Sequence, residues 1–231
     1  MRQLAVFDID GTLTDTNAVD DECYLGAVAD VLGLERYSLD WSAAPHVTDS
    51  GLLRWLAERH AAPLDASHES AVVTRFVELL NQQLAASPAR FRPIRGAVTV
   101  RAELEGRGWQ VALATGGWEP SARLKLDAVG FDLKEIILAS ASDALTRMDI
   151  IQCALRRATE RFGTFARVVS LGDAVWDVRT ATAVGWPFVG VATGARADQL
   201  RAHGASTILA DLSDVDELSA ALAAAEIPTM P

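Results

Sequence analysis

Cysteine is scarce in this sequence of 231 residues. Its two cysteines, Cys23 and Cys153, stand far apart, without a CxxC pair or the spacing of a zinc site. Domains that depend on disulfides or on structural zinc carry more cysteines, at closer and more regular spacings. We therefore expect two separate reduced thiols and no disulfide framework.

Long hydrophobic runs are also missing. A membrane-spanning helix needs about 20 consecutive, mostly apolar residues, and no segment approaches that length. The first residues, MRQLAVFDID, reach acidic side chains too early for a signal peptide. We expect a cytoplasmic protein with no membrane partner.

Positive charge is in short supply: 21 Lys and Arg residues oppose 31 Asp and Glu residues, for a formal net charge of -10. Such a chain repels the phosphates of a nucleic acid, so we expect no nucleic-acid partner. A small anionic substrate remains compatible, because a single pocket can be locally positive. Half of the residues are hydrophobic, which is enough for a globular core.

Short apolar segments alternate with longer amphipathic ones along most of the chain. The segments predicted as buried strands are Leu4–Phe7, Gln110–Ala114, Glu135–Leu138, Arg167–Leu171, Phe188–Val191 and Thr207–Leu209. Helical patterns separate most of them, for example over residues 119–130 and 148–163. This alternation predicts an α/β fold with a doubly wound parallel sheet and helices on both of its faces.

One region departs from this alternation. Between about Thr16 and Ser87 no segment has strand character, and apolar residues recur at helical spacing. Residues 87–96, with two prolines and a glycine, have the composition of a linker. We therefore predict a core domain of residues 1–15 and 88–231, and an all-helical domain of residues 16–87 inserted after the first strand.

The first predicted strand ends in a pair of carboxylates. In the stretch LAVFDIDGTLTD, Asp8 and Asp10 come directly after four mostly apolar residues. Residues i and i+2 of an extended chain point to the same side, so both carboxylates can face one site. Two close carboxylates repel each other unless a cation lies beside them, and Mg²⁺ prefers such oxygen ligands.

Polar groups follow the other predicted strands as well. They are Thr115, Gly116 and Gly117 after the second strand, Arg147 after the third, and Asp173 and Asp177 after the fourth. Taken singly, each has a structural explanation as a turn, a helix cap or a surface charge. Parallel sheets bind ligands at the carboxyl ends of their strands, so the set together indicates magnesium-assisted phosphoryl transfer.

These motifs resemble those of a known family. FDIDGTLTD is similar to the DxDGTxxD signature of the haloacid dehalogenase superfamily, in its phosphatase branch. LATGG resembles the second motif of that family, and LGDAVWDVRTATAVGWPFVGVATG the fourth. The resemblance covers the chain from end to end. It implies a Rossmann-like core with a helical cap of the C1 type, as in phosphoglycolate phosphatases.

The resemblance also implies a role for each acidic motif residue. Asp8 would be the nucleophile that forms an aspartyl-phosphate. Asp10 would be the general acid for the leaving oxygen and then the base for the hydrolytic water. Asp8, the backbone carbonyl of Asp10 and Asp173 would bind Mg²⁺. Asp177 would support the metal through its waters or orient Asp173.

By the same resemblance, the phosphoryl oxygens would be held by Thr115 and the amide of Gly116. The third motif of the family usually has a lysine, often followed by proline, whereas the matching position here is Arg147, in TRMDII. Arginine keeps the positive charge and offers a bidentate fork. Lys125, ten residues after Thr115, is the other nearby cation. We expect it to be a surface lysine of the next helix.

Within the predicted cap, the stretch WSAAPHVTDSGLLRWL gathers polar residues ahead of a helix. One interpretation is helix capping, with Asp49 or Ser50 as the N-cap. The other is a substrate-contacting loop, because related caps reach the site from this position, and it makes His46 and Thr48 substrate-binding candidates. Three acidic residues near the first cap helix are predicted to form its negatively charged first turn: Asp20, Asp21 and Glu22.

The leading hypothesis is a magnesium-dependent phosphatase that acts on a small phosphorylated metabolite, as a monomer or a homodimer. A phosphomutase of the same superfamily is the nearest alternative, and a non-catalytic member that binds a phospho-ligand is the alternative outside enzymes. A dehalogenase would lack the second aspartate, present here as Asp10. A phosphonatase would need a cap lysine, and none occurs between Thr16 and Ser87.

Overall fold

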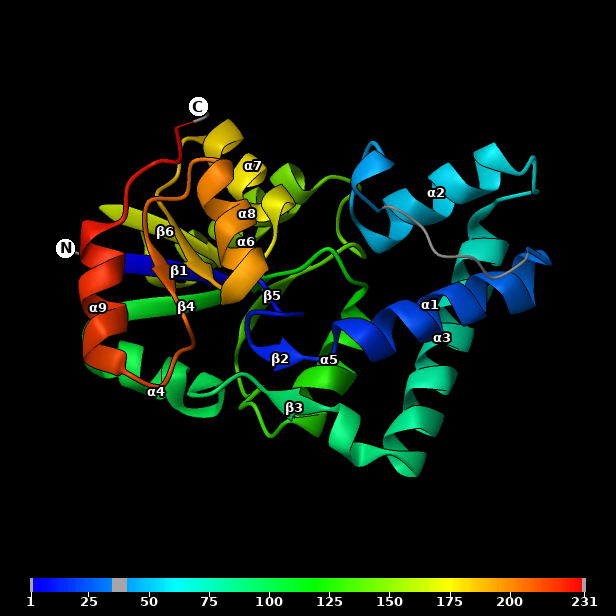
Figure 1. Ribbon diagram of the computed structural model, residues 1–231, viewed down its shortest axis with the longest axis horizontal. Helices are drawn as coiled ribbons and strands as arrows, with labels where there is room; N and C mark the ends of the chain where they lie inside the picture. The colour runs from blue at the N-terminus through cyan, green and yellow to red at the C-terminus, as the bar shows by residue number, and fades with distance from the viewer. Residues whose placement is uncertain (1, 35–40, 230–231) are drawn as a thin grey trace.

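The computed structural model describes residues 2–34 and 41–229, in which strands and helices alternate (Figure 1). The strands are β1 (Gln3–Phe7), β2 (Thr14–Asp15), β3 (Arg92–Pro93), β4 (Trp109–Ala114), β5 (Ile137–Ala139), β6 (Arg167–Gly172), β7 (Phe188–Val191) and β8 (Ile208–Leu209). The α-helices are α1 (Asn17–Leu32), α2 (Asp49–Arg59), α3 (Ala66–Ala86), α4 (Ala97–Gly106), α5 (Glu119–Ala128), α6 (Arg147–Phe162), α7 (Val175–Val184), α8 (Gly194–Ala202) and α9 (Val215–Ala224).

Six of these strands form one parallel sheet in the order β5-β4-β1-β6-β7-β8. The chain runs from β1 outward to one edge through β4 and β5, and then returns to the other side of β1 through β6. In the register of the sheet, Phe7 lies opposite both Leu113 and Leu171. The carboxyl ends of β1, β4 and β6 therefore meet at the point where strand order reverses, which is where such sheets bind ligands.

The central strand alternates its side chains between the two helical layers. Ala5 and Phe7 pack in a cluster with residues of α4 and α9, whereas Leu4 and Val6 pack in another with residues of α6. A strand buried on both faces has no polar side, which explains its uninterrupted apolar sequence. The predicted α/β class with a doubly wound parallel sheet is confirmed, and each predicted strand overlaps an observed one.

The helices α1, α2 and α3 follow β2 and pack around their own apolar cluster, which includes Tyr24, Leu53 and Phe76. In Figure 1 they lie at the right, and β2 and β3 lie between them and the sheet. β2 pairs antiparallel with β3, so the outgoing and returning chains run side by side. Trp118, just before α5, is also part of this cluster. The division at residues 16 and 87 remains a prediction.

The cysteines and the hydrophobicity of the helices are both subjects of sequence-based expectations. Cys23 and Cys153 are both buried and form no disulfide, as predicted. Across the two described ranges, no helix combines the length and the hydrophobicity that a bilayer crossing requires.

Candidate active site

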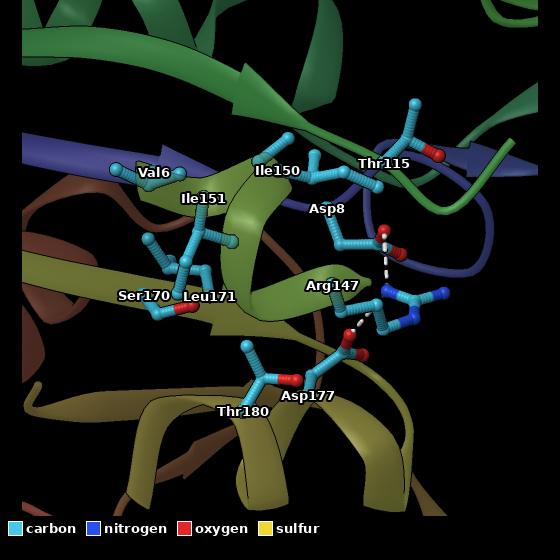
Figure 2. A pocket seen from close by; sticks show the side chains of 11 residues that line it. Val6, Asp8, Thr115, Arg147, Ile150, Ile151, Ser170, Leu171, Asp177 and Thr180 are labelled. Carbon is cyan, nitrogen blue, oxygen red and sulfur yellow. Dashed lines mark hydrogen bonds and ion pairs between the residues drawn. The ribbon is translucent and has the colours of Figure 1, made fainter. Parts of the chain in front are cut away.

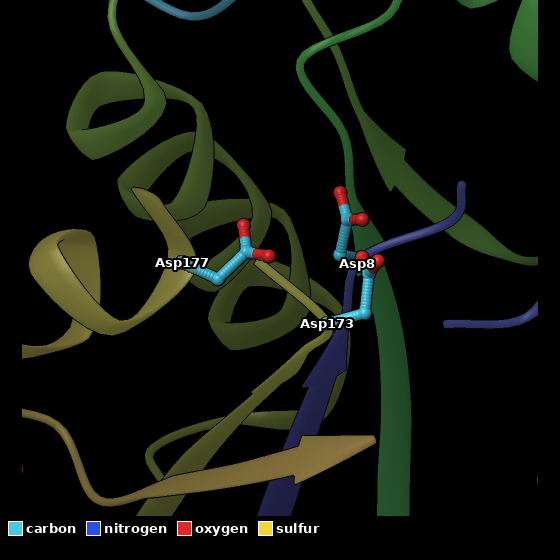
Figure 3. A group of neighbouring side chains, drawn as sticks. All are labelled: Asp8, Asp173 and Asp177. Atoms are coloured by element: carbon cyan, nitrogen blue, oxygen red, sulfur yellow. The ribbon is translucent and has the colours of Figure 1, made fainter. Parts of the chain in front are cut away.

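Three buried aspartates converge at the carboxyl ends of β1 and β6 (Figure 3). Asp8 follows β1 and donates its backbone N–H to the Leu171 carbonyl at 2.9 Å. Asp173 follows β6, and Asp177 lies in the first turn of α7. One carboxylate oxygen from each of the three lies within 4.8 Å of the others. Asp8 thus forms one acidic group with two aspartates that lie far from it in sequence, after β6 and in α7.

Burial and mutual repulsion shift the acidity of all three groups. Burial, then the charge of Asp177, raise the pKa of Asp8 well above its usual value, against the lowering effect of Arg147. Burial and the charge of Asp8 raise the pKa of Asp173 to about 7. Burial raises the pKa of Asp177 to about 6, although Arg147 opposes the shift. A bound cation would relieve this repulsion, and three carboxylates are ligands suited to Mg²⁺, so the donor set fits that ion.

A glycine is required beside this acidic group. Gly11 has a φ of +85°, which L side chains rarely adopt, and a side chain there would collide with the Asp173 carboxylate. This accounts physically for the glycine that follows Asp10 in the first motif.

Arg147 lies between the acidic groups, as Figure 2 shows. It is the first residue of α6, and its Nη1 lies 2.8 Å from Asp177 Oδ1 and 3.4 Å from Asp8 Oδ1. Its Nε donates to the Val47 carbonyl at 2.8 Å. The small crevice in Figure 2, about 10 Å³, lies among these residues, and that volume is at the lower limit for one water molecule. The predicted third-motif cation is therefore at the site.

The segment after β4 lies against Arg147. A side-chain carbon at Gly116 would come within 2.7 Å of the arginine Nη2 and within 2.9 Å of the Val47 backbone carbonyl, so a larger residue would require the backbone to shift. Thr115 is buried, and its Oγ1 accepts the Gly117 N–H at 3.1 Å. Within residues 2–34 and 41–229, no acceptor takes the Gly116 N–H. The anion-binding role expected of this glycine-rich turn remains a prediction.

A larger cavity of about 820 Å³ opens over this edge of the sheet. Its lining includes the core residues Asp8, Asp10, Thr115, Gly116, Arg147 and Asp173, together with Asp20, Tyr24, His46, Thr48 and Asp49 from the helical insert. Asp177 does not line this cavity and instead lines the small crevice. The structure thus brings every predicted site residue to one region, at the boundary between the core and the predicted cap.

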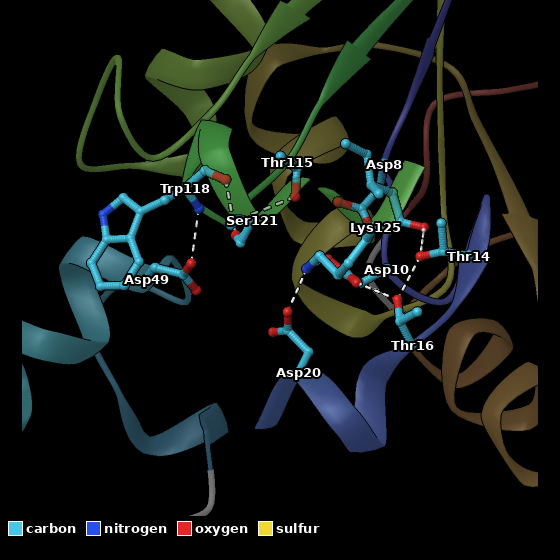
Figure 4. A network of polar contacts seen from close by, with 12 residues as sticks. Asp8, Asp10, Thr14, Thr16, Asp20, Asp49, Thr115, Trp118, Ser121 and Lys125 are labelled. Atoms are coloured by element: carbon cyan, nitrogen blue, oxygen red, sulfur yellow. Dashed lines mark hydrogen bonds and ion pairs between the residues drawn. The ribbon is translucent and has the colours of Figure 1, made fainter. Parts of the chain in front are cut away.

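The Asp10 side chain has partners different from those of Asp8 (Figure 4). It is not part of the three-carboxylate group. Its Oδ1 accepts from Thr16 Oγ1 at 2.7 Å, and its Oδ2 lies 2.6 Å from Lys125 Nζ. The Lys125 ammonium also contacts the Asp20 carboxylate. The proposed metal contact of Asp10 uses its backbone carbonyl and remains a prediction.

The expectation that Lys125 is a surface residue is wrong. Its side chain is fully buried, on the face of α5 that also buries Ser121, Ala122 and Leu126. Ala122 and Leu126 of this face pack in the core cluster with residues of the sheet, and the Lys125 ammonium contacts the carboxylates of Asp10 and Asp20. A signal was present in the sequence, because Lys125 lies three residues after Ala122 and next to Leu126, in the helical spacing of a buried stripe.

The capping prediction for the loop before α2 is also wrong in its residue. The helix begins at Asp49, and its N-cap is Thr48, whose Oγ1 accepts the Gly51 N–H at 3.1 Å. The same hydroxyl donates to the Leu145 carbonyl at 2.8 Å, in the segment before α6. Thr48 is therefore both a helix cap and a link between the insert and the core, so its hydroxyl is already engaged.

Asp49 instead points its carboxylate toward the segment after β4. It accepts the Trp118 N–H at 2.8 Å, and its own N–H donates to the Gly116 carbonyl at 2.7 Å. Burial raises the pKa of Asp49 to about 7, although Lys125 opposes the shift. The first residue of α2 is thus hydrogen-bonded directly to the glycine-rich turn of the site.

Sequence reasoning missed one further cation. Arg196, in the first turn of α8, places its Nη1 2.5 Å from Asp173 Oδ2 and lines the larger cavity. It follows the glycine-rich segment VATG, and no local pattern distinguishes it from a surface arginine. Its side chain is half exposed, so we assign it no role in holding the carboxylate.

The fold and the acidic strand ends define a hydrolase of the haloacid dehalogenase type. The model of one family, described as haloacid dehalogenase-like hydrolase, matches residues 3–185. The chain belongs to this family. The match spans all of the strand-end motifs described above, from β1 to the end of α7.

Curated relatives are more specific. A phosphoglycolate phosphatase of Mesorhizobium japonicum is 26% identical, over 96% of this chain and 95% of its own. A phosphoglycolate phosphatase of Caulobacter vibrioides is 29% identical, over 90% and 87% of the two chains. A probable phosphatase of Dickeya dadantii, IndB, is 27% identical, over 93% and 92%. These relatives place the chain with the phosphatases of the family.

Solved structures match the fold over nearly the whole chain. A hydrolase from Pseudomonas syringae has a TM-score of 0.70 at 18% identity, covering 94% of this chain and 97% of that one. CbbY from Rhodobacter sphaeroides, in complex with phosphate, has a TM-score of 0.68 at 20% identity, covering 93% and 96%. At such identities these matches support the arrangement of core and helical insert, and no shared substrate follows from them.

Proposed function

We propose that this enzyme is a magnesium-dependent phosphatase that hydrolyses a small phosphomonoester through an aspartyl-phosphate on Asp8. The observation that carries the proposal is the convergence of Asp8, its two acidic neighbours and Arg147 at the carboxyl ends of β1 and β6, beside the larger cavity. Membership in a hydrolase family and the phosphatase relatives support it.

The metal would be held by the acidic group described above. Asp8 and Asp173 would be its side-chain ligands, with the backbone carbonyl of Asp10, and Asp177 would orient Asp173 or bind through water. When bound, the ion supplies positive charge that offsets the repulsion between the phosphate dianion and these carboxylates.

The residues themselves divide the reaction into two steps. In the first step, an Asp8 oxygen forms a bond to phosphorus while the ester P–O bond breaks. The electron pair of the broken bond stays on the leaving oxygen, which takes a proton from Asp10. Asp10 then accepts a proton from the water that attacks the aspartyl-phosphate, which releases phosphate and restores Asp8. Arg147, the Thr115 hydroxyl and the Gly116 amide would hold the phosphoryl oxygens throughout.

The substrate remains a small phosphorylated metabolite in this proposal, and the protein a cytoplasmic monomer or homodimer. Two curated relatives are named phosphoglycolate phosphatases. We therefore place 2-phosphoglycolate first in a panel of esters that also contains sugar phosphates and nucleotides.

The test is phosphate release from this panel, with Mg²⁺ or with EDTA, by the wild type, Asp8→Asn and the control Asp127→Asn. Asp127 is an exposed carboxylate of α5, so its replacement leaves the site intact. We expect turnover that needs Mg²⁺, survives Asp127→Asn and falls by at least about 10³-fold in Asp8→Asn, since the nucleophile is lost.

Two results would contradict the proposal. Equal release by the wild type and Asp8→Asn would remove Asp8 as the nucleophile. No release of phosphate from any ester, by a folded protein that binds Mg²⁺, would favour the phosphomutase or the binding-only alternative.

A further inference from the structure

Lys125 is a buried cation that the proposed reaction does not use. The chain has one other lysine, Lys134, which is exposed. Lys125 extends from α5, and two carboxylates, of Asp10 and Asp20, compensate its charge. Burying a lysine is costly unless it is paired and hydrogen-bonded. Both partners raise its pKa, so the group is an ammonium that donates hydrogen bonds and has no free lone pair for nucleophilic attack.

The contact with Asp10 fixes the orientation of that carboxylate. Lys125 Nζ lies 2.6 Å from one oxygen, and Thr16 Oγ1 lies 2.7 Å from the other. Thr16 is held in turn by Thr14, with 2.6 Å between the two hydroxyl oxygens. Each carboxylate oxygen has two lone pairs. The two donors therefore hold the group without occupying all of its positions for a proton.

The contact with Asp20 connects the same ammonium to the helical insert. Asp20 lies in the first turn of α1, and its side chain is 16% exposed. Lys125 thus links its own helix, α5, to the loop after β1 and to the first insert helix (Figure 4). All three segments border the larger cavity through Asp10, Asp20 and Gly117, the last just before α5.

We propose that Lys125 is a positioning residue that holds the Asp10 carboxylate in place beside the leaving oxygen. This inference rests on the proposed phosphatase function, in which Asp10 gives its proton to the departing alkoxide. The ammonium contacts one oxygen of Asp10 and the Thr16 hydroxyl contacts the other, so the carboxyl group keeps a single orientation toward the cavity. Asp20 balances the remaining positive charge and keeps the lysine side chain extended toward Asp10.

The leaving group of the substrate provides a readout that a purely structural role would not change. An alkyl phosphate releases a strongly basic alkoxide and needs a proton from Asp10. The p-nitrophenolate released from p-nitrophenyl phosphate is weakly basic and needs little acid assistance. General acid catalysis contributes about 10²–10⁴-fold, so a misplaced Asp10 should penalise the alkyl ester selectively.

The experiment compares kcat/KM for the best alkyl ester of the panel with kcat/KM for p-nitrophenyl phosphate. Lys125→Met should lower the first at least about tenfold more than the second. Lys125→Arg, which keeps a cationic donor, should recover part of the alkyl-ester activity. Lys134→Met, at the exposed lysine, should change neither value.

A charge-balanced double variant protects the test against misfolding. Lys125→Met leaves the buried Asp10 and Asp20 without a cation, and the protein could fail to fold for that reason. In Lys125→Met/Asp20→Asn one charge of each sign is removed, so the net charge of the cluster is unchanged. We expect this variant to fold and to show the same selective loss on the alkyl ester.

The outcomes separate this inference from the function on which it rests. A wild type that hydrolyses neither ester contradicts the phosphatase proposal itself. A wild type that hydrolyses both, with equal fractional losses in the folded Lys125 variants, would overturn the positioning role and leave Lys125 as a structural ion pair. A selective loss on the alkyl ester in the double variant supports positioning of Asp10.

Discussion

At the scale of single residues, burial has a larger effect on the pKa values of this site than the type of residue does. Asp8, Asp49, Asp173 and Asp177 are ordinary carboxylic acids, yet burial is the largest cause of the raised pKa of each. Lys125 shows the complementary case, because paired carboxylates keep a buried amine charged. Perturbed ionisable groups that lie close together at or beside a cavity are typical of functional sites.

Asp49 gives a pH prediction that does not involve the proposed metal ligands. Its pKa is about 7 in the fold, against an ordinary 3.8 when unfolded. Between these values the folded protein keeps a proton that the unfolded chain has released, so the contribution to stability is full below pH 3.8 and falls as pH rises through 7. Asp49→Asn should therefore lose less stability than the wild type between about pH 4.5 and 7.5.

Urea unfolding in EDTA at both ends of this range measures the effect. From the lower to the higher pH, we expect the free energy of unfolding of the wild type to fall by about 1–3 kcal/mol more than that of Asp49→Asn. The aspartates that do not interact with Asp49 contribute equally to both proteins, whereas Asp20, whose pKa the Asp49 charge raises, contributes to the difference. Parallel pH dependences of the wild type and Asp49→Asn would contradict the shift.

At the scale of elements, the start of α2 joins the insert to the core. The Thr48 hydroxyl caps the helix and donates to the Leu145 carbonyl, so one group stabilises both a helix terminus and a contact between distant segments. Trp118 adds an apolar contact at the same boundary, and its Nε1 donates to Ser50 Oγ at 2.8 Å. The start of α2 is therefore fixed on the core by both polar and apolar contacts.

Thr48 variants separate the hydroxyl from the methyl group. Thr48→Val keeps the shape but removes the cap and leaves the Leu145 carbonyl without its donor, so we expect a loss of about 1–3 kcal/mol in the free energy of unfolding. Thr48→Ser keeps both hydrogen bonds and should lose less. Denaturant unfolding measures both variants, and a larger loss in the serine variant would show that packing dominates this position.

At the scale of the whole molecule, the helical insert closes the cavity above the acidic strand ends. The acidic residues and Arg147 lie at the strand ends, whereas His46 and its neighbours face the same cavity from the insert. In the proposed function, the core would carry out the reaction and the insert would select the alcohol. Binding contacts to the part of the substrate that does not react would then set specificity.

His46→Ala tests this division of labour. We expect the ratio of kcat/KM between esters of the panel to change by about 5- to 30-fold, because one pocket contact contributes about 1–2 kcal/mol. The Mg²⁺ requirement should stay as in the wild type. Arg54→Ala, at an exposed position of α2, serves as the control. A uniform change across all esters would exclude His46 as a specificity residue.

Much of the fold and of the site could be predicted because the signals are local. Apolar runs of strand length gave the six parallel strands, and carboxylates directly after β1 and β6 gave the acidic group. The carboxyl ends of parallel strands lie at the same edge of the sheet, so residues that directly follow neighbouring strands lie close together whatever the course of the loops. Arg147 was predictable for the same reason, as the start of the helix after β5.

Only the tertiary structure decided the environments of Lys125, Thr48 and Trp118. Lys125 finds its partners 115 and 105 residues away, at Asp10 and Asp20. Thr48 reaches across 97 residues to Leu145. Local pattern determines which helix or strand a residue joins. Burial and pairing of an ionisable side chain depend on which distant segments lie against it. Here the loop after β1 supplies Asp10 and the first insert helix supplies Asp20, so an apparent surface lysine is buried and paired.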